Sequence, residues 1–336
     1  MVAQSVFIIA EAGVNHCGDL QKAMEMVEVA ARSGADAIKF QTFKAASLTV
    51  SDAPKAAYQK KATGDDGNQQ SMLSELELSD EDHAFLFECC QKFGIEFMST
   101  GFDTESVDLL VRLGIARIKV PSGEITNLPL LRHICRQGLP VILSPGMADL
   151  EEIDAAIRAM ASSGLGVDQL TVLHCNTAYP TPFEDANLRC IHTIQRELGV
   201  KVGYSDHTLG NEAAVAAVAL GASIIEKHFT LDRRLPGPDQ FCRLEPNELA
   251  KLVSKIRNIE VGMGDGIKRP SPSEQVNIDV ARKSLVASQA IRKGEILSAK
   301  NMTAKRPGTG ISPMHWDELD GTPATRSYQP DDQLEK

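Results

Sequence analysis

The chain has 336 residues, of which 43% are hydrophobic and 24% are charged, and its formal net charge at pH 7 is −10. This balance is typical of a globular protein with enough apolar residues for a large core. The negative charge and the lack of basic runs argue against a nucleic-acid partner, and the apolar runs are too short to cross a bilayer. The first residues lack the features of a signal peptide. Together with seven scattered cysteines, these features favour a reduced, cytoplasmic protein with no membrane partner.

Short apolar runs alternate with longer amphipathic segments from residue 6 to about 261. The runs, which we expect to be strands, are Val6–Ala10, Ala37–Phe40, Glu96–Ser99, Arg117–Val120, Pro140–Leu143, Leu170–Leu173, Lys201–Tyr204 and Ser223–Ile225. The segments between them that predict helices include Leu20–Ser33, Thr104–Leu113, Leu150–Ser162, Asn211–Leu220 and Glu248–Val261. A glycine stands where a helix must stop before the next strand, at Gly34, Gly94, Gly114, Gly138, Gly199 and Gly221.

Eight such strand–helix units predict a closed (β/α)₈ barrel, the TIM barrel. The alternative is an open doubly wound sheet. That fold usually has fewer strands, and no Gly-x-Gly-x-x-Gly motif follows the first run here.

Two further segments differ in composition from the repeating units. Residues 42–78 form the largest irregular insertion, and a loop of that length on a barrel is usually a lid or a binding element. After Gly262 the pattern changes, and a stretch rich in proline and serine begins at Pro270. We therefore predict a barrel catalytic domain over residues 1–268, a linker over 269–283 and a small β-rich domain over 284–336, with strand-like pieces at Ser284–Ala287 and Glu295–Leu297.

Polar residues stand at the ends of all the predicted strands. In a parallel barrel the active site lies at these carboxyl ends, so the residues found there are candidates for a common site. In chain order they are Glu11, Lys39, Gln41, Ser99, Thr100, Lys119, Ser122, Glu124, Ser144, His174, Asn176, Thr177, Tyr179, Ser205, His207, Glu226 and His228.

The two-residue period of a strand places several of these candidates on one face. Lys39 with Gln41, Ser205 with His207, and Glu226 with His228 are each two positions apart, whereas Asp206 and Lys227 point the other way. Lysines and hydroxyls suit a phosphorylated anion. Histidines beside carboxylates suit a divalent metal or proton transfer, and we interpret His207 and His228 together as a metal pair.

A lone histidine at a strand end has a simpler interpretation. We expect His174 to be a structural residue that is satisfied by hydrogen bonds. A nucleophilic dyad of His174 with Cys175 is rejected, because neighbouring residues of a strand face opposite ways.

Several long motifs stand at or near the predicted strand ends. They are Phe7-Ile8-Ile9-Ala10-Glu11-Ala12-Gly13-Val14-Asn15-His16, Lys39-Phe40-Gln41-Thr42-Phe43, Pro121-Ser122-Gly123-Glu124, His174-Cys175-Asn176-Thr177-Ala178-Tyr179-Pro180, Tyr204-Ser205-Asp206-His207-Thr208, Glu226-Lys227-His228-Phe229-Thr230 and Gly237-Pro238-Asp239. Together these motifs resemble those of the sialic acid synthase family. Lys305-Arg306-Pro307-Gly308, followed by Gly310-Ile311-Ser312-Pro313, resembles the family's C-terminal module, which is similar to type III antifreeze protein and is called the SAF domain. The resemblance covers nearly the whole chain.

The resemblance implies a (β/α)₈ barrel and a domain-swapped homodimer in which the small module caps the partner's site. The implied reaction condenses phosphoenolpyruvate with an open-chain N-acetylmannosamine-type sugar and water. It gives N-acetylneuraminate, a sialic acid, and phosphate by C–O cleavage. The implied cofactor is Mn²⁺ or Mg²⁺. The same chemistry on a 2,4-diacetamido-2,4,6-trideoxyhexose, giving legionaminic or pseudaminic acid, is the alternative.

The resemblance also implies roles for individual residues. His207 and His228 would bind the metal, and Glu11 and Glu124 are the candidates for handling protons, with their shares undecided. Phosphoenolpyruvate would be held by Lys39, Thr100, Lys119, Ser122, Ser144, Asn176 and Ser205, with Thr177 as the alternative to Asn176. The sugar would contact Gln41, Tyr179, Glu226, Asp239 and, from the other subunit, Arg306.

The sequence departs from the family pattern at three places. Gly101 stands where proline is frequent, Pro145 where threonine is usual and Thr309 where asparagine is common. Because Thr309 lies near the proposed sugar-facing arginine, the sugar is left open. Two other function classes remain as hypotheses. One is a Schiff-base aldolase that uses Lys39 or Lys119, and the other is a non-catalytic carbohydrate-binding protein.

Overall fold

The structure of the chain is a computed structural model that describes residues 5–55, 60, 67–235, 237, 240 and 243–336. It divides into two compact units, Met1–Gly264 and Asp265–Lys336. Each unit is described by itself below.

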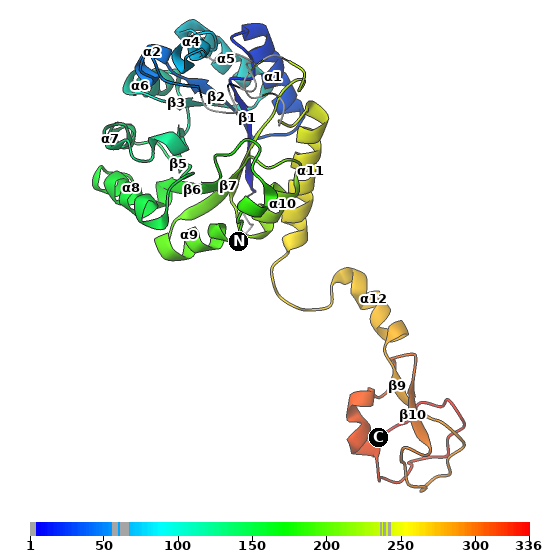
Figure 1. Cartoon of the computed structure of the whole chain (residues 1–336). Coiled ribbons are helices and arrows are strands. Elements are labelled where there is room, and N and C mark those ends of the chain that lie inside the picture. The colour runs from blue at the N-terminus through cyan, green and yellow to red at the C-terminus, as the bar shows by residue number, and fades with distance from the viewer. Residues whose placement is uncertain (1–4, 56–59, 61–66, 236, 238–239, 241–242) are drawn as a thin grey trace. The chain divides into compact units, whose positions relative to one another are not determined.

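The first unit is built around a closed parallel barrel of eight strands in sequence order (Figure 1). The strands are β1 (Phe7–Gly13), β2 (Ala37–Thr42), β3 (Glu96–Gly101), β4 (Ile118–Val120), β5 (Val141–Leu143), β6 (Leu170–Cys175), β7 (Lys201–Asp206) and β8 (Ile224–His228). The barrel closes because β8 pairs in parallel with β1. The predicted TIM barrel is confirmed, and the open-sheet alternative is wrong.

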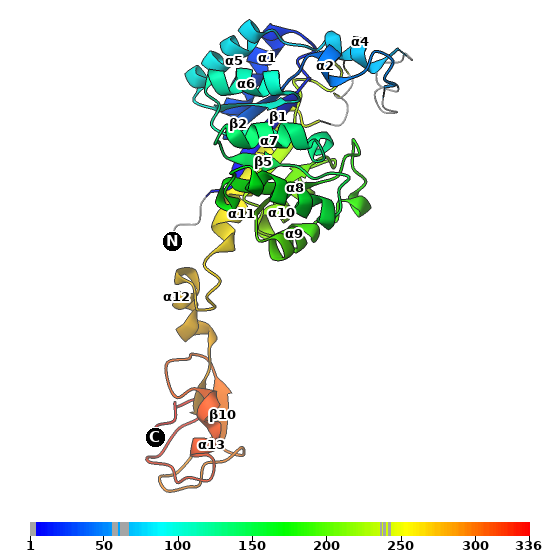
Figure 2. The ribbon, with the colours of Figure 1, turned by 90° about the vertical axis from the view of Figure 1, so that its left-hand side faces the viewer.

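Helices surround the strands as an outer layer (Figure 1 and Figure 2). They are α1 (Leu20–Arg32), α5 (Asp80–Phe93), α6 (Thr104–Leu113), α7 (Leu128–Arg136), α8 (Leu150–Ser162), α9 (Cys190–Leu198), α10 (Glu212–Ala219) and α11 (Pro246–Met263). None of the described helices is both long and apolar enough to cross a membrane.

Local sequence signals set the ends of these helices. Asp19 caps α1 by accepting hydrogen bonds from two backbone N–H groups, and caps of this kind stabilise a helix by about 1 kcal/mol. Gly94, Gly114 and Gly199 end α5, α6 and α9 in the left-handed conformation, which residues with a Cβ rarely adopt. The predicted glycine stops are confirmed at these helices.

Two apolar layers fill the barrel unit. The larger layer packs between the strands and the helices. The smaller layer fills the barrel interior and consists of the buried residues Ile9, Ala37, Met98, Ile142, Leu173 and Ile224, with Phe7 packed against them. Each of these six interior residues precedes, by two positions, a residue that is considered below as part of the candidate site.

The insertion after β2 contains two short helices, α2 (Ala45–Leu48) and α4 (Gln69–Ser74). They lie side by side and form a small apolar cluster with residues from the ends of β1 and β3. This part of the predicted irregular segment is therefore helical and packed against the barrel.

The second unit contains α12 (Pro272–Ala281), β9 (Ser284–Ala287), β10 (Met302–Lys305) and α13 (Trp316–Leu319). Helix α12 falls within the segment predicted as a linker, and it buries none of its residues. Strand β9 is confirmed and pairs antiparallel with β10. The prediction of a strand at Glu295–Leu297 is wrong, because only Ile296 makes an isolated bridge there, with Pro323.

Candidate active site at the carboxyl ends of the strands

A cavity of about 610 Å³ opens at the carboxyl ends of the barrel strands. The interior residues explain its composition, because each is followed two positions later, on the same face of its strand, by a residue that lines the cavity. Most of the predicted site residues line it, namely Glu11, Lys39, Gln41, Thr100, Lys119, Ser122, Ser144, Tyr179, Ser205, His207, Glu226 and His228. The common site predicted from the strand ends is therefore present as a single cavity.

Four buried charged side chains, which alternate in sign, lie side by side at the bottom of the cavity. We call this group, Glu11, Lys39, Glu226 and Lys119, the floor of the cavity. Lys39 Nζ lies 2.5 Å from Glu11 Oε2 and 3.7 Å from Glu226 Oε2. Lys119 Nζ lies 3.4 Å from Glu226 Oε1. All four side chains are at most 5% exposed, so each charge depends on its neighbours rather than on water.

Hydroxyl groups form hydrogen bonds with three of these charged groups. Lys39 donates to Thr100 Oγ1 at 3.1 Å, and Lys119 donates to Ser144 Oγ at 2.8 Å. Ser205 Oγ donates to Glu226 Oε1 at 2.9 Å. Because ammonium and hydroxyl groups converge here, the floor can hold an anion that carries several oxygens.

The two carboxylates differ in acidity. Burial is the main cause that raises the pKa of Glu11, to about 7, against the opposing attraction of Lys39. Burial also acts to raise the pKa of Glu226, but Lys119 and Lys39 outweigh it and hold that pKa at about 2. Glu226 is thus a fixed anion at neutral pH, whereas Glu11 can take up and release a proton.

The pKa values of the two lysines are shifted in opposite directions. Burial acts to lower the pKa of Lys39, but Glu11 and Glu226 outweigh it and raise that pKa. For Lys119, burial is the largest influence and lowers the pKa, in opposition to Glu226.

His207 and His228 stand together at one side of the cavity. Their ring centroids are 5.3 Å apart, and the ring of Tyr179 lies 4.2 Å from that of His207. Burial lowers the pKa of His207 to about 3 and lowers the pKa of His228 well below its usual value. Both imidazoles are therefore neutral at pH 7, which is the form that binds metals.

The hydrogen bonds of the two rings leave nitrogen atoms available. His207 Nδ1 donates to the backbone carbonyl of Asn176, so Nε2 carries the free lone pair. Among the residues that the structure describes, Nδ1 of His228 has no hydrogen-bond partner. No group of three or more His, Cys, Asp or Glu side chains that could hold a metal occurs in the described part of the chain. Two imidazoles fit a divalent ion that keeps its other positions for water and substrate.

Residues on the opposite face of the strands behave as the period predicts. Lys227 Nζ lies 2.7 Å from Asp206 Oδ2 outside the barrel interior. His174 donates to the carbonyl of Ala186 and stacks on Tyr204, so it is a structural residue as expected. Cys175 lines the cavity while His174 does not, so the two cannot form a dyad.

Of the strand-end candidates, Ser99 faces away from the cavity and its hydroxyl hydrogen-bonds to that of Thr42. Four residues to which the resemblance gave a role are also not among those that line the cavity. Glu124 lies in a short 3₁₀ turn, where its carboxylate accepts from Asn127 Nδ2 at 2.6 Å. The side chain of Asn176 accepts from the backbone of Ala178, and Thr177 lines the cavity in its place. Arg306 belongs to the second unit, where it donates to the carbonyl of Ala281. Asp239 lies outside the described residues.

Comparison with known proteins identifies the group to which this chain is related. Residues 26–268 match the NeuB family, and residues 282–336 match the SAF domain. The chain belongs to the NeuB family. This is the sialic acid synthase family that the motifs indicate, so that prediction and the predicted C-terminal SAF domain are confirmed.

Relatives across the NeuB family match almost the full chain. The N,N'-diacetyllegionaminic acid synthase of Campylobacter jejuni is 50% identical, over 98% of both proteins. That of Legionella pneumophila is 46% identical, over 95% of this chain and 90% of the relative. The crystal structure of the N-acetylneuraminic acid synthetase of Leptospira borgpetersenii in complex with citrate has a TM-score of 0.71 and 38% identity, and the match covers 82% of this chain and 90% of that one.

The sequence prediction missed several residues of this NeuB-type cavity. Cys175 follows the interior residue Leu173 by two positions, a signal that the strand period contains. Met72, Leu73 and Leu76 line the cavity from the insertion, where no strand period marks them.

Arg243 was also missed. It lies between β8 and α11 and is not among the residues that line the cavity, but it is only 2% exposed and places its guanidinium 4.9 Å from the centre of the ring of the lining residue Tyr179. Local sequence contains no signal for that position, because the approach to Tyr179 depends on the closed barrel.

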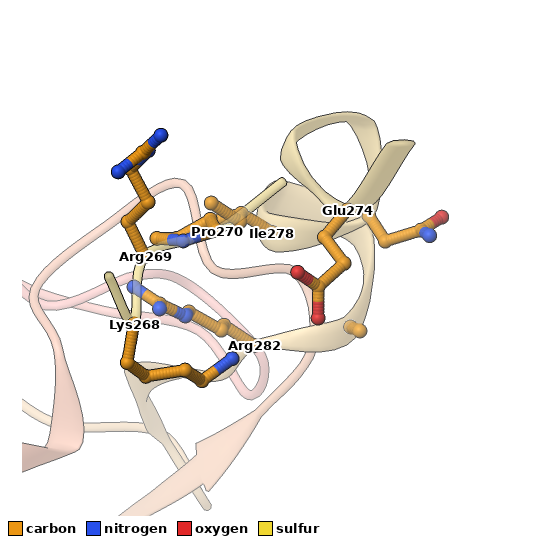
Figure 3. A pocket seen from close by; sticks show the side chains of 8 residues that line it. Lys268, Arg269, Pro270, Glu274, Ile278 and Arg282 are labelled. Atoms are coloured by element: carbon orange, nitrogen blue, oxygen red, sulfur yellow. The ribbon is translucent and has the colours of Figure 1, made fainter. Parts of the chain in front are cut away.

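A second hollow, of about 520 Å³, lies within the C-terminal unit (Figure 3). Its basic side chains are Lys268, Arg269 and Arg282. These residues are exposed, and Arg269 already pairs with Asp265 at 2.5 Å. The hollow therefore lacks the buried, converging groups that distinguish the barrel cavity.

Proposed function

We propose that the chain is a metal-dependent synthase that condenses phosphoenolpyruvate with an open-chain 2,4-diacetamido-2,4,6-trideoxyhexose and water. The products are a nine-carbon diacetamido 2-keto acid of the legionaminic type and phosphate. The observation that carries the chemistry is the pair of buried lysines beside two neutral imidazoles in one cavity. The choice of sugar follows the relatives that are 50% and 46% identical, and it replaces N-acetylmannosamine, the first expectation from the motifs.

In this proposal the floor of the cavity holds phosphoenolpyruvate. Lys39 and Lys119 offset its negative charge, and Thr100, Ser144 and Ser205 hydrogen-bond its oxygens. Their function is orientation, because the C3 carbon of phosphoenolpyruvate must face the sugar aldehyde before a bond can form.

His207 and His228 would hold Mn²⁺ or Mg²⁺ in this proposal. The ion would supply Lewis acidity toward the sugar aldehyde oxygen. The residues themselves fix the place of the aldehyde, because Tyr179 packs on both rings and Asn176 orients His207.

The proposed reaction forms one C–C bond and one C–O bond to water, and it breaks the C–O bond to phosphate. C3 of phosphoenolpyruvate attacks the aldehyde carbon, and the aldehyde oxygen takes up a proton to become a hydroxyl. Water adds to C2 and gives up both of its protons, the C2–O bond to phosphate breaks as C2 becomes the keto carbon, and the second proton leaves with the phosphate. Glu11 accepts the proton of the attacking water, because its carboxylate lies in the cavity and its pKa is about 7. Glu124 lies outside the cavity lining, which favours Glu11 of the two candidates.

The deciding assay follows phosphate release from phosphoenolpyruvate with each acetamido sugar and Mn²⁺. In ¹⁸O-labelled water, we expect the label in the keto acid and unlabelled phosphate, and we expect EDTA to abolish turnover. Absence of turnover with every sugar would refute the proposal. Borohydride trapping of Lys39 or Lys119 by a keto acid, with full activity in EDTA, would instead support the Schiff-base aldolase.

The proposal extends to assembly and location. We propose that the active form is a domain-swapped homodimer in which Arg306 contacts the sugar in the partner's cavity. We place the reaction in the cytoplasm. The described cysteines, none of which forms a disulfide with another described residue, suit that reducing compartment.

A further inference from the structure

The cavity has an apolar wall as well as its polar floor. We define this wall by six lining residues, which are Val14, Met72, Leu73, Leu76, Phe102 and Met147. They follow strands β1, β2, β3 and β5, so they lie in the connections beyond the strand ends that carry the charged groups, and Met72 and Leu73 belong to helix α4 in one of these connections. Moving outward from the floor, the cavity therefore changes from charged to hydrophobic.

We infer that the apolar wall selects the far end of the sugar and recognises a methyl group, rather than a hydroxymethyl group, at C5 of the sugar. This inference rests on the proposed function. The aldehyde carbon must lie at the floor, near the imidazoles and the bound phosphoenolpyruvate, so C4 to C6 extend outward toward the loops.

The chemistry of the wall favours a deoxygenated sugar end. A hydroxyl group that leaves water to face Met72 and Leu73 receives no hydrogen bond from these side chains, so it loses hydrogen bonds that it made to water. A methyl group loses no hydrogen bonds and gains from removal of its surface from water. N-acetylmannosamine carries a hydroxyl at C6, where the 6-deoxy sugar has only a methyl group, so it makes the poorer contact with the wall.

The wall is held in place by its own packing. Met72, Leu73 and Leu76 are each at most 9% exposed and belong to one apolar cluster with Val14 and Phe43. A wall of this kind is already formed before the sugar binds, so it discriminates by contact rather than by rearrangement.

Met147 adds an independent observation. Its φ is 69°, a left-handed conformation that is unfavourable for any residue with a Cβ, and its side chain is 74% exposed. Glycine would adopt this backbone at no steric cost, yet a long apolar side chain stands at the cavity edge. Such outliers concentrate at ligand-binding sites, and the cavity lining places Met147 at one.

The test compares kcat/KM for 2,4-diacetamido-2,4,6-trideoxymannose with kcat/KM for N-acetylmannosamine, at saturating phosphoenolpyruvate and Mn²⁺. We expect the unaltered protein to prefer the first sugar by roughly 10–200-fold, the range that apolar pockets reach. Met72→Gln and Met147→Gln keep the side-chain length and add polarity, and each should reduce the preference about tenfold. Leu48→Gln is the matched control, since Leu48 packs in the same cluster without lining the cavity.

Each outcome of this comparison either supports or contradicts the selective role of the apolar wall. Because Met147 is exposed, Met147→Gln gives a result even if Met72→Gln does not fold. The wall would not be the selective element if the preference were unchanged in Met147→Gln, or if it fell equally in Leu48→Gln. Either result would leave the proposed synthase activity standing. Preference of the unaltered protein for N-acetylmannosamine would overturn both the role of the wall and the choice of sugar in the proposed function, but not the condensation itself. Absence of phosphate release with both sugars would instead refute the proposed function itself.

Discussion

The carboxylate of Glu226 lies 3.4 Å from the ammonium of Lys119, and both side chains are only 4% exposed. The other oxygen of Glu226 lies 3.7 Å from Lys39. One permanent anion therefore offsets two buried cations in the absence of substrate. Since Glu11 is only partly ionised at neutral pH, Glu226 is the main internal counterion of the floor.

Replacement of this counterion should destabilise the empty protein. We expect Glu226→Gln to lower the free energy of unfolding by about 3–5 kcal/mol, because two buried ammonium groups lose their partner. Added phosphoenolpyruvate should recover part of the loss, since its charge replaces that of the carboxylate. Denaturant unfolding with and without phosphoenolpyruvate measures both effects. The exposed Glu151→Gln is the control, and equal losses in the two variants would contradict the counterion role.

Glu11 should determine how the rate depends on pH. Because the pKa of Glu11 is about 7 and the proposed role needs its ionised form, kcat/KM should rise through an inflection near pH 7. Glu11→Gln should lose most of the activity and the inflection with it. A profile that keeps this inflection in Glu11→Gln would assign it to another group.

The same shift has a consequence for stability. The folded pKa of Glu11 is raised from 4.5 to about 7, so the folded state holds a proton that the unfolded state releases between these values. The unfolding free energy should therefore fall as pH rises from 4.5 to 7, by up to about 3 kcal/mol relative to Glu11→Gln. Denaturant curves of both proteins across this range give the difference.

His207→Ala and His228→Ala should abolish metal binding without unfolding the barrel. Each removes one of the two neutral imidazoles that we propose as metal ligands, and neither residue belongs to the apolar layers. Calorimetric titration with Mn²⁺ measures the affinity, and circular dichroism checks the fold. The exposed His192→Ala is the matched control. If either site variant binds Mn²⁺ as tightly as the control does, that residue is not a ligand.

Arg243 should act through Tyr179. Its guanidinium lies 4.9 Å from the ring centre in a desolvated place, where such contacts reach about 2 kcal/mol. We expect Arg243→Met to raise the KM for the sugar about tenfold or more, with the KM for phosphoenolpyruvate unchanged, and Arg243→Lys to recover part of the loss. In a Tyr179→Leu background the effect of Arg243→Met should vanish. Additive effects in the double variant would contradict the coupling.

The strand period explains how much of the site could be predicted. Glu11, Lys39, Thr100, Ser144 and Glu226 each follow an interior apolar residue by two positions, so pattern alone places them in the cavity. The position of Glu124 could not be predicted in the same way, because the chain turns into a 3₁₀ helix directly after Pro121 and the period ends. Arg243 and the apolar wall depend on loops, whose approach to the cavity is set by tertiary packing rather than by local pattern.

Arg306 allows the proposed domain swap to be tested by activity. It lies in the unit that follows Gly264, and its backbone belongs to the SAF domain. Arg306→Ala should raise the KM for the sugar while size-exclusion chromatography still gives a dimer. An unchanged KM for the sugar would count against the contact.

Mixing two defective variants, at a sugar concentration so far below the KM of Arg306→Ala that this variant turns over little alone, distinguishes a contact within one subunit from a contact between subunits. In a swapped dimer, the intact barrel of an Arg306→Ala subunit is capped by a partner that carries His207→Ala and retains Arg306. If the subunits exchange at random, half of the dimers contain one subunit of each variant. Each of these mixed dimers regains one of its two active sites, so about a quarter of full activity should return. A contact within one subunit leaves every site defective, because each barrel then lacks either His207 or Arg306. Restored activity on mixing would therefore require Arg306 to act in the partner's cavity, and unrestored activity would place it in its own.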